Sequence, residues 1–246
     1  MRKYLLILVL SGIVLGACNK RTDTYNIQAL SDYFPLQSGK YITYNLDSTI
    51  FINFGTLQSV VKYQVQDRID SQIIDNLGRK AFRVLRFIRK DSTQPWIANN
   101  TFMAIPTGNT IEYTENNHRF IKLVEPIVNG YTWKGNTFID TYSIYSDVKY
   151  LDDWDYIYDS LNVPLTLGTL RVDSTLKVKE RDEFLGQDPN IPSTQYAEKN
   201  YSVEKYAKNI GLIYKEFLHW EYQGGQPSRP AYYVGYGVKL TMIDHN

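Results

Sequence analysis

Hydrophobic residues recur at every second position through most of the chain after residue 40. Val61, Tyr63 and Val65 alternate with polar residues, and a longer alternation runs from Tyr232 to Met242. A period of two places successive side chains on opposite faces of an extended strand, so each segment has one face to bury. The 21 Tyr residues, with many Val, Ile and Thr, suit such a pleated surface. The sequence therefore predicts half-buried strands.

Turn-forming residues separate these strand segments. The clearest turn signals lie at residues 75–78, 129–130, 134–136 and 223–225. Successive short strands and turns favour antiparallel pairing over alternating strand and helix units. We predict a mainly β fold with a single antiparallel β domain, arranged as a curved open half-barrel or as a sandwich, and with one or two short helices.

Two segments carry helical signals. Residues 24–33 fit a short helix that ends before Pro35. Residues 194–208 fit a helix and an alternating strand about equally well, so both alternatives stay open. Residues 188–193 are expected to form an exposed loop, because they hold two prolines that extend neither kind of element.

One short pattern recurs: a proline, an aliphatic residue, two further residues and a glycine, followed by a strand. It occurs at residues 35–39, 126–130 and 164–168. The proline keeps the approach extended, and the glycine accepts a turn conformation that other residues resist. The spacing between the three copies is unequal, so the pattern indicates a turn that is reused and not a repeat architecture.

The N-terminal segment predicts the compartment. Two basic residues precede an uncharged, almost continuously apolar run at residues 4–15, which is shorter than the roughly 20 residues that a spanning helix needs. The sequence Leu-Gly-Ala-Cys at residues 15–18 follows at once and resembles the bacterial lipobox. In a lipobox the cysteine is diacylated and becomes the new N-terminus. The resemblance implies a lipid on Cys18, which is the single cysteine of the chain.

This resemblance also implies a division of the chain. Residues 1–17 are expected to be a lipoprotein signal peptide, residues 18–30 a lipidated tether, and residues 31–246 the antiparallel β domain. The lipid on Cys18 would attach the protein to the membrane, and no other segment of the sequence approaches membrane-spanning length. Asn19 stands where an Asp resembles an inner-membrane retention signal, so the outer membrane is favoured. The periplasmic and the outer face of that membrane both stay open.

The charge balance argues against a nucleic-acid partner. Lys and Arg total 27 and Asp and Glu total 26, which gives a net charge of +1 and no field to steer a polyanion. One cysteine excludes a disulfide within the chain and a thiolate metal cluster. The three histidines, His118, His219 and His245, lie far apart and lack the spacing of metal ligands.

The sequence offers no motif for catalysis. It lacks a Gly-x-Ser-x-Gly elbow, a His-Glu-x-x-His pair and a glycine-rich phosphate loop. We therefore assign no catalytic residue, no cofactor and no metal ligand, and expect no enzyme activity. Gly235 and Gly237 lie within a strand pattern, which indicates a bulge or a close approach of neighbouring backbone.

Residues 152–159 form the densest acidic stretch of the chain. Clustered carboxylates attract hard cations such as Ca²⁺, but aromatic residues interrupt the stretch and the spacing of an EF-hand loop is missing. A solvated acidic loop is the favoured interpretation, and a calcium site is the alternative.

Asp-Ser followed by Thr or an aliphatic residue marks four candidate modification sites, at Ser48, Ser92, Ser160 and Ser174. The pattern resembles the O-glycosylation acceptor of Bacteroidetes envelope proteins. Asp and Ser also initiate turns by bonding nearby backbone, so a purely local role stays open.

Trp96, Trp133, Trp154 and Trp220 could provide stacking platforms for sugars or the lining of an apolar cavity. Aromatic residues also fill β cores and strand surfaces routinely, so packing is the favoured role for these four side chains.

Three longer motifs resemble one group of proteins. Residues 33–44 follow the pattern YFPLxxGxYxxY, where x is any residue. Residues 205–216 read KYAKNIGLIYKE, and residues 123–133 form a middle segment. These motifs resemble uncharacterised Bacteroidetes-type envelope lipoproteins, some of which are similar to the curved half-barrel of periplasmic lipoprotein carriers. The resemblance implies a concave sheet with an apolar lining, and it transfers no catalytic residue.

We therefore expect a non-enzymatic, lipid-anchored envelope protein that binds a protein, a glycan or a lipid. The alternative is a structural or assembly component of an envelope complex, and a weaker alternative is a carbohydrate-active enzyme. An empty apolar interior would favour the carrier-like function, and a fully packed sandwich would favour the assembly component. Two acidic side chains facing each other across an aromatic cleft would favour the enzyme.

Overall fold

The alternating segments pair into one twelve-stranded antiparallel sheet in the computed structural model, which describes residues 28–246. The strands are β1 (Tyr41–Ile52), β2 (Leu57–Ile74), β3 (Lys80–Arg89), β4 (Ile97–Pro106), β5 (Thr110–Glu115), β6 (His118–Val124), β7 (Thr132–Lys134), β8 (Asp155–Leu167), β9 (Leu170–Gly186), β10 (Tyr196–Ala207), β11 (Gly211–Gln223) and β12 (Tyr232–His245). A short helix α2 (Leu30–Tyr33) precedes them, and a 3-10 turn η1 (Lys149–Leu151) lies before β8.

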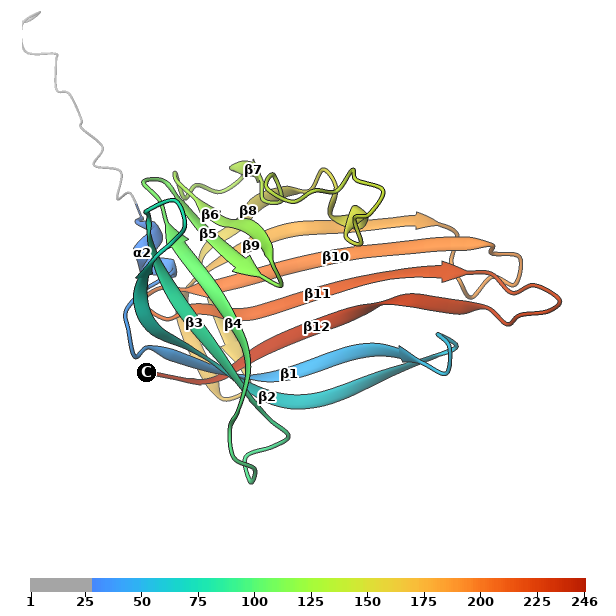
Figure 1. The fold of residues 1–246 in the computed structure, drawn as a ribbon, viewed down its shortest axis with the longest axis horizontal. Helices are drawn as coiled ribbons and strands as arrows, with labels where there is room; N and C mark the ends of the chain where they lie inside the picture. Colours follow the sequence, from blue (N-terminus) through green and yellow to red (C-terminus); the bar gives the residue numbers. More distant parts are fainter. Residues whose placement is uncertain (1–27) are drawn as a thin grey trace, which may run out of the picture.

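The sheet consists of two meanders that meet at its centre. The strand order is β6-β5-β4-β3-β2-β1-β12-β11-β10-β9-β8-β7, so pairing of β1 with β12 joins the two halves. This order leaves β6 and β7 at the two edges. Figure 1 shows that the β3–β6 half curls over the β8–β11 half.

The two edges come into contact and nearly close the sheet into a barrel-like form. The backbone N–H of Ile121 donates to the carbonyl of Gly135 at 2.8 Å, and Trp133 Nε1 donates to the carbonyl of Ile121 at 2.8 Å. Closing the edges in this way covers backbone groups that an open sheet leaves exposed. The predicted mainly β, antiparallel fold with short helices is confirmed, and the sheet is more closed than an open half-barrel.

The turn and helix predictions have clear outcomes. The three glycines of the repeated pattern, Gly39, Gly130 and Gly168, all have positive φ, which confirms the predicted turn role. Of the residues predicted to hold a helix, 30–33 form α2 and 24–27 lie outside the described residues. Within residues 194–208, strand β10 spans 196–207, so the strand alternative is the one observed, and residues 188–193 form the predicted loop.

The core fills the inside of the curled sheet. Its largest buried side chains include Trp154, Tyr156 and Tyr158, and Trp133 packs on both tyrosines with ring centroids 5.8 and 4.7 Å apart. Trp96 lies under Arg89, and Trp220 makes edge contacts with neighbouring aromatic rings. All four tryptophans therefore make packing contacts, as the favoured role requires.

The expected signal peptide and Cys18 lie outside the described residues, as do residues 18–27 of the expected tether, so these stay predictions. Leu30, at the end of the expected tether, is buried against the core as the first residue of α2. None of the helices in residues 28–246 combines the length and the hydrophobicity that crossing a bilayer requires.

Candidate functional site

The interior of the sheet contains a cavity of about 550 Å³. Residues of the β5–β6 hairpin, the segment around η1, and strands β8 to β12 line it. Its aromatic lining consists of Phe120, Tyr150, Trp154, Tyr156, Phe217 and Tyr236. We call this cavity the aromatic cleft.

The cross-strand register of β11 and β12 builds one wall of the aromatic cleft. Phe217 pairs with Val238, and His219 pairs with Tyr236, so alternate residues of both strands share the inner face. The Tyr150 ring stacks on His219 with centroids 3.7 Å apart, and its hydroxyl lies 3.2 Å from that of Tyr236. These contacts form a continuous aromatic surface.

Gly235 allows this wall to form. Its φ is +143°, and a Cβ at this position would lie 2.2 Å from the carbonyl oxygen of His219. The backbone of β12 therefore approaches β11 closer than any side chain permits. Of the two predicted roles for Gly235, the close backbone approach is confirmed.

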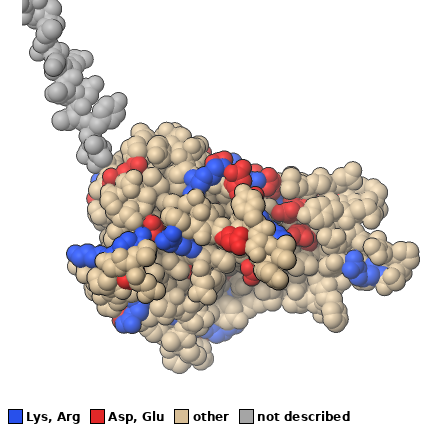
Figure 2. All heavy atoms as spheres, turned by 45° about the horizontal axis from the view of Figure 1, so that its top comes forward, with Lys and Arg blue, Asp and Glu red and all other residues tan. Residues whose placement is uncertain are grey.

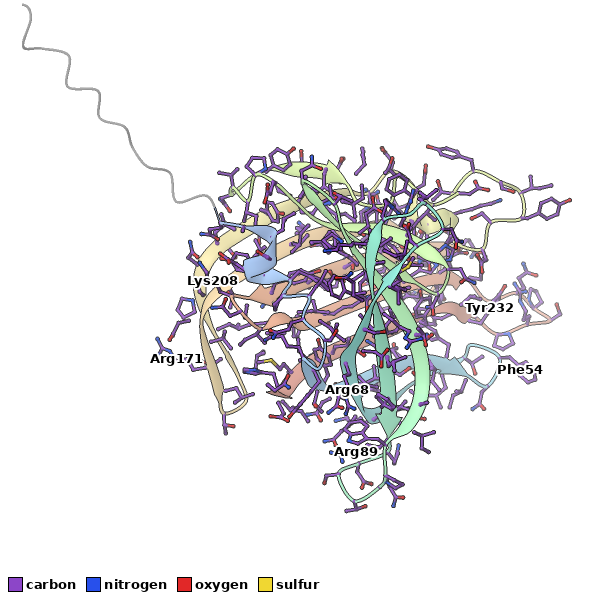
Figure 3. The ribbon with its side chains drawn as sticks, turned by 60° about the vertical axis from the view of Figure 1, so that its left-hand side comes forward. Phe54, Arg68, Arg89, Arg171, Lys208 and Tyr232 are labelled. Atoms are coloured by element: carbon purple, nitrogen blue, oxygen red, sulfur yellow. The ribbon has the colours of Figure 1, made fainter. Side chains whose placement is uncertain are left out.

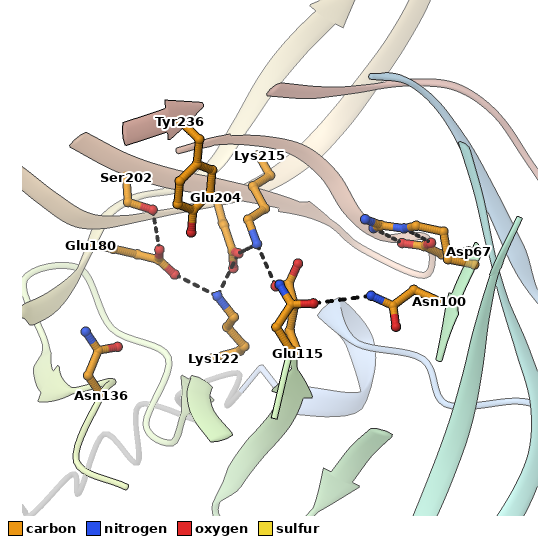
Figure 4. Close-up of polar contacts among 12 residues, drawn as sticks. Asp67, Asn100, Glu115, Lys122, Asn136, Glu180, Ser202, Glu204, Lys215 and Tyr236 are labelled. Atoms are coloured by element: carbon orange, nitrogen blue, oxygen red, sulfur yellow. Dashed lines mark hydrogen bonds and ion pairs between the residues drawn. The ribbon is translucent and has the colours of Figure 1, made fainter. Parts of the chain in front are cut away.

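The charged side chains of Glu115, Lys122, Glu180 and Lys215 form the floor of the aromatic cleft, and Glu204 pairs with both lysines without lining the cleft. We call Glu115, Lys122, Glu180, Glu204 and Lys215 the charged cluster (Figure 4). Lys122 Nζ donates to Glu180 Oε1 at 3.2 Å and to Glu204 Oε1 at 2.8 Å. Lys215 Nζ donates to Glu115 Oε2 at 2.8 Å and lies 3.7 Å from Glu204 Oε1.

The charged cluster connects the two halves of the sheet. Glu115 and Lys122 come from the β5–β6 hairpin, whereas their partners come from β9, β10 and β11. Neutral donors satisfy further carboxylate oxygens, since the Ser202 hydroxyl donates to Glu180 at 2.5 Å and the Tyr206 hydroxyl donates to Glu204. Such complete pairing is what makes buried charges tolerable.

The environment drives the pKa values of these carboxyls apart. Burial, reinforced by the charge of Glu204, raises the pKa of Glu180 despite the nearby Lys122. Burial also acts on Glu204, but Lys122 and Lys215 outweigh it and hold its pKa below the usual range. For Glu115, burial is outweighed by Lys215 and two further cations, and its pKa falls to about 2.

A second, smaller cavity of about 90 Å³ lies on the other side of the charged cluster. Its lining is mainly apolar and includes Phe34, Ile42, Tyr44 and Leu212. Glu115, Lys122 and Lys215 line both cavities, so the charged cluster separates a polar, aromatic space from an apolar one.

Two of the three histidines, His118 and His219, line the aromatic cleft. His219 is buried, its Nδ1 lies 2.8 Å from Asn200 Oδ1, and burial lowers the pKa of its ring. His245 is exposed at the end of β12. Among residues 28–246, no group of three His, Cys, Asp or Glu side chains is arranged to hold a metal ion.

The acidic stretch at residues 152–159 spreads its carboxylates over separate partners. Lys134 pairs with Asp153 at 2.5 Å and with Asp155 at 2.8 Å, and Lys177 pairs with Asp159 at 2.5 Å. These side chains are exposed, as predicted, but residues 155–159 belong to strand β8 and not to a loop.

The four candidate glycosylation sites lie away from the aromatic cleft. Ser92 is exposed in the loop between β3 and β4, whereas Ser48, Ser160 and Ser174 are half-buried on strands. In the loop that contains Ser92, the Asp91 carboxylate accepts a hydrogen bond from the backbone N–H of Thr93 at 2.9 Å, as the local turn role requires. Modification of these serines stays a prediction.

Sequence reasoning missed the charged cluster, although a signal was present. Lys122 shares a strand face with Phe120, Lys215 shares one with Phe217, and Glu204 shares one with Tyr206. A charge on an otherwise apolar face of a strand indicates a buried, paired group. The pairing itself depends on strands that are distant in the sequence.

Comparison with known proteins finds only distant structural likenesses. The sequence matches no protein-family model and no curated protein. The chain is similar to an exported protein with a YmcC-like fold from Bacteroides fragilis, at 13% identity and a TM-score of 0.39, covering 86% of this chain and 99% of that chain. It is also similar to a protein described as a lipoprotein from Parabacteroides distasonis, at 11% identity and a TM-score of 0.33, covering 89% and 100%. Likenesses at these TM-scores carry no conclusion about the function of this chain.

Proposed function

We propose that this chain is a lipid-anchored envelope protein that binds a glycan in the aromatic cleft without chemical turnover. The observation that supports this function is a cavity of about 550 Å³ with an aromatic wall and a charged floor inside a nearly closed sheet. Pockets with apolar walls and a few convergent polar groups are the usual binding sites of small molecules.

The lining favours a polyhydroxylated ligand over a lipid or a simple ion. Aromatic faces pack against the apolar faces of sugar rings, and carboxylates and ammonium groups accept from and donate to hydroxyls. The floor of the cleft presents two carboxylates, Glu115 and Glu180, and the ammonium groups of Lys122 and Lys215, so a strongly charged ligand of either sign meets like charges. A hydroxyl both donates and accepts, and so fits a floor with both kinds of partner.

The pairing of the carboxylates favours binding over catalysis. Both oxygens of Glu180 are engaged, one by Lys122 and one by Ser202. Glu115 is held by Lys215 at 2.8 Å. Proton transfer to a glycosidic oxygen would require these contacts to break first.

The binding function is tested by purifying the natively expressed protein and analysing the retained saccharides by mass spectrometry. Tyr236→Ala, which removes an exposed ring from the cleft wall, is expected to lose the saccharide. Tyr131→Ala is the matched control, because Tyr131 is similarly exposed (36% against 43%) and does not line the cleft. A wild-type protein that retains no saccharide, or equal retention by both variants, would favour the assembly component instead.

The membrane anchor is tested separately through Cys18. Replacing Cys18 by Ser removes the acceptor thiol, so the protein is expected to move from the detergent phase to the aqueous phase on phase partitioning. Unchanged partitioning of this variant, together with a wild-type N-terminal peptide that carries no lipid in mass spectrometry, would contradict the lipid anchor. The outer membrane is the proposed location because of Asn19, and fractionation of the two membranes tests it.

A second candidate function, a glycoside hydrolase, is favoured by one observation. Glu115 and Glu180 both line the aromatic cleft, and their pKa values are shifted in opposite directions. Paired carboxyls with separated pKa values are typical of an acid and a base in glycosidases. Release of new reducing ends from an oligosaccharide pool by the wild type, abolished in Glu180→Gln, would support the hydrolase over the binding protein.

A further inference from the structure

Three hairpin tips meet at one end of the molecule. They are residues 52–57 between β1 and β2, residues 187–195 between β9 and β10, and residues 224–231 between β11 and β12; we call them the tip surface. Figure 1 shows these tips at the right, whereas α2 lies at the left. Figure 3 likewise places Phe54 and Tyr232 at one end and Lys208 and Arg171 at the other.

The tips support one another. The backbone N–H of Tyr233 donates to the carbonyl of Gly55 at 2.9 Å, and the Phe51 and Tyr233 rings stack at 5.3 Å. The backbone N–H of Gly224 donates to the carbonyl of Gln195 at 2.8 Å. The tip surface is therefore a built platform and not three independent loops.

The tip surface is nearly free of charge. Asp188 and Arg229 are its charged residues, and both interact locally: Asp188 accepts from Asn190, and Arg229 lies 4.4 Å from the centre of the Tyr232 ring. The sequence as a whole is 22% charged. Figure 2 shows this difference in charge density. On the face drawn there, charged side chains gather over the middle and left, and few lie at the right-hand end.

Large apolar side chains project from this uncharged end. Phe54 is fully exposed, and Ile52, Leu57 and Ile191 are exposed as well. Scattered single exposed apolar residues are ordinary, but a group on adjoining tips marks an interaction surface.

The backbone of Phe54 has a positive φ, which is unfavourable for a residue with a large side chain. Residues 52–55 form a tight turn in which Gly55 N–H donates to the Ile52 carbonyl at 3.1 Å, and Asn53 and Phe54 have φ of 52° and 57°. Asn and Gly are the residues that suit such positions. Because the exposed ring gains no packing within the chain, this strain points to a contact outside it.

We propose that the tip surface inserts into the interfacial region of a lipid bilayer, with Phe54 as the deepest side chain. The surface is convex, since it consists of hairpin ends, and a deformable bilayer fits projecting apolar side chains without a preformed pocket. Phe, Leu and Ile flanked by neutral Asn, Gln, Ser and Thr match the apolar and polar layers of that region. One acidic and one basic residue leave no net charge, so zwitterionic lipid is sufficient.

The test uses the mature chain, residues 18–246, with Cys18→Ser, so that acylation contributes nothing. This protein is expected to sediment with phosphatidylcholine vesicles, equally at low and high salt. Phe54→Asn is expected to lower the partition coefficient at least about tenfold, since a large buried apolar side chain is lost. Asn suits a positive φ, so this variant is expected to melt no lower than its parent, which separates binding from folding.

Leu77→Asn is the matched control. Leu77 is 72% exposed in the turn that follows β2, at the opposite end of that strand from the tip surface, and its replacement is expected to leave vesicle binding unchanged. Absence of vesicle binding by the parent chain would overturn the proposal and leave a protein as the partner of the tips. An equal reduction of vesicle binding by Phe54→Asn and by Leu77→Asn would also overturn the proposal.

Discussion

Replacement of Lys122 by Met would leave two buried carboxylates without their shared counter-ion. The side chains of Glu180 and Glu204 are 3% and 2% exposed, and Lys122 Nζ lies 3.2 and 2.8 Å from them. Met fills a similar volume, so the main effect is electrostatic. Removing one partner of a buried ion pair costs about 3–5 kcal/mol. For a domain of this size that corresponds to a melting temperature lower by about 6–20 °C.

The same reasoning predicts how this loss of folding stability depends on pH. Without Lys122, the pKa of Glu180 would rise further above its unfolded value and Glu204 would lose the strongest of the charges that lower its pKa, so the variant gains stability as the pH falls toward 4.5. The wild type gains less, because its Glu204 has a lowered pKa. The difference between the two proteins is therefore expected to be largest near neutral pH and to shrink in mild acid.

Urea unfolding followed by tryptophan fluorescence at pH 7 and pH 5 measures both effects. The control is Lys122→Met combined with Glu180→Gln and Glu204→Gln, which removes the unpaired charges and is expected to recover at least about half of the lost free energy. Equal unfolding midpoints for the wild type and the Lys122→Met variant at pH 7 would refute the structural role assigned to the charged cluster.

Other predictions follow from single positions. Gly235→Ala would force a Cβ to 2.2 Å from the His219 carbonyl and is expected to destabilise by more than about 2 kcal/mol in thermal unfolding, whereas Gly108→Ala meets nothing within 4 Å and is expected to change little. Glu115 has a pKa of about 2, so it stabilises the fold above its unfolded pKa of 4.5 and loses this contribution as the pH falls from 4.5 toward 2. Glu115→Gln is expected to cost about 3 kcal/mol at pH 7 and almost nothing near pH 2, and a pH-independent cost would contradict this. Mass spectrometry of protein from a glycosylating host is expected to find the exposed Ser92 modified ahead of the other three serines, and unmodified peptides across all four sites would remove the idea.

Local patterns predicted the strands well because the physics of a half-buried strand is local. The face predicted from Tyr232 to Met242 lines the aromatic cleft at Tyr236 and Val238 and is buried in the core at Leu240 and Met242. Gly39, Gly130 and Gly168 have the positive φ that their pattern required. Each of these features depends on neighbours within a few residues.

The closure of the sheet and the charged cluster depend on distant residues. Whether the sheet remains open is decided by contacts such as that between Ile121 and Gly135, at the edges of the two meanders. Lys122 meets Glu180 and Glu204 only because the β5–β6 hairpin curls over β9 and β10. Single-strand periodicity shows which face is buried, but not which distant face covers it.

The binding of a glycan in the aromatic cleft is tested most directly by backbone hydrogen exchange. Oligosaccharides released from the envelope of the host are added to the purified mature protein, and exchange is compared with and without them. Slower exchange is expected at residues 116–120 and 234–238, which line the cleft, and no change at residues 53–57 in the tip surface. Unchanged exchange at both cleft segments would contradict the proposed function.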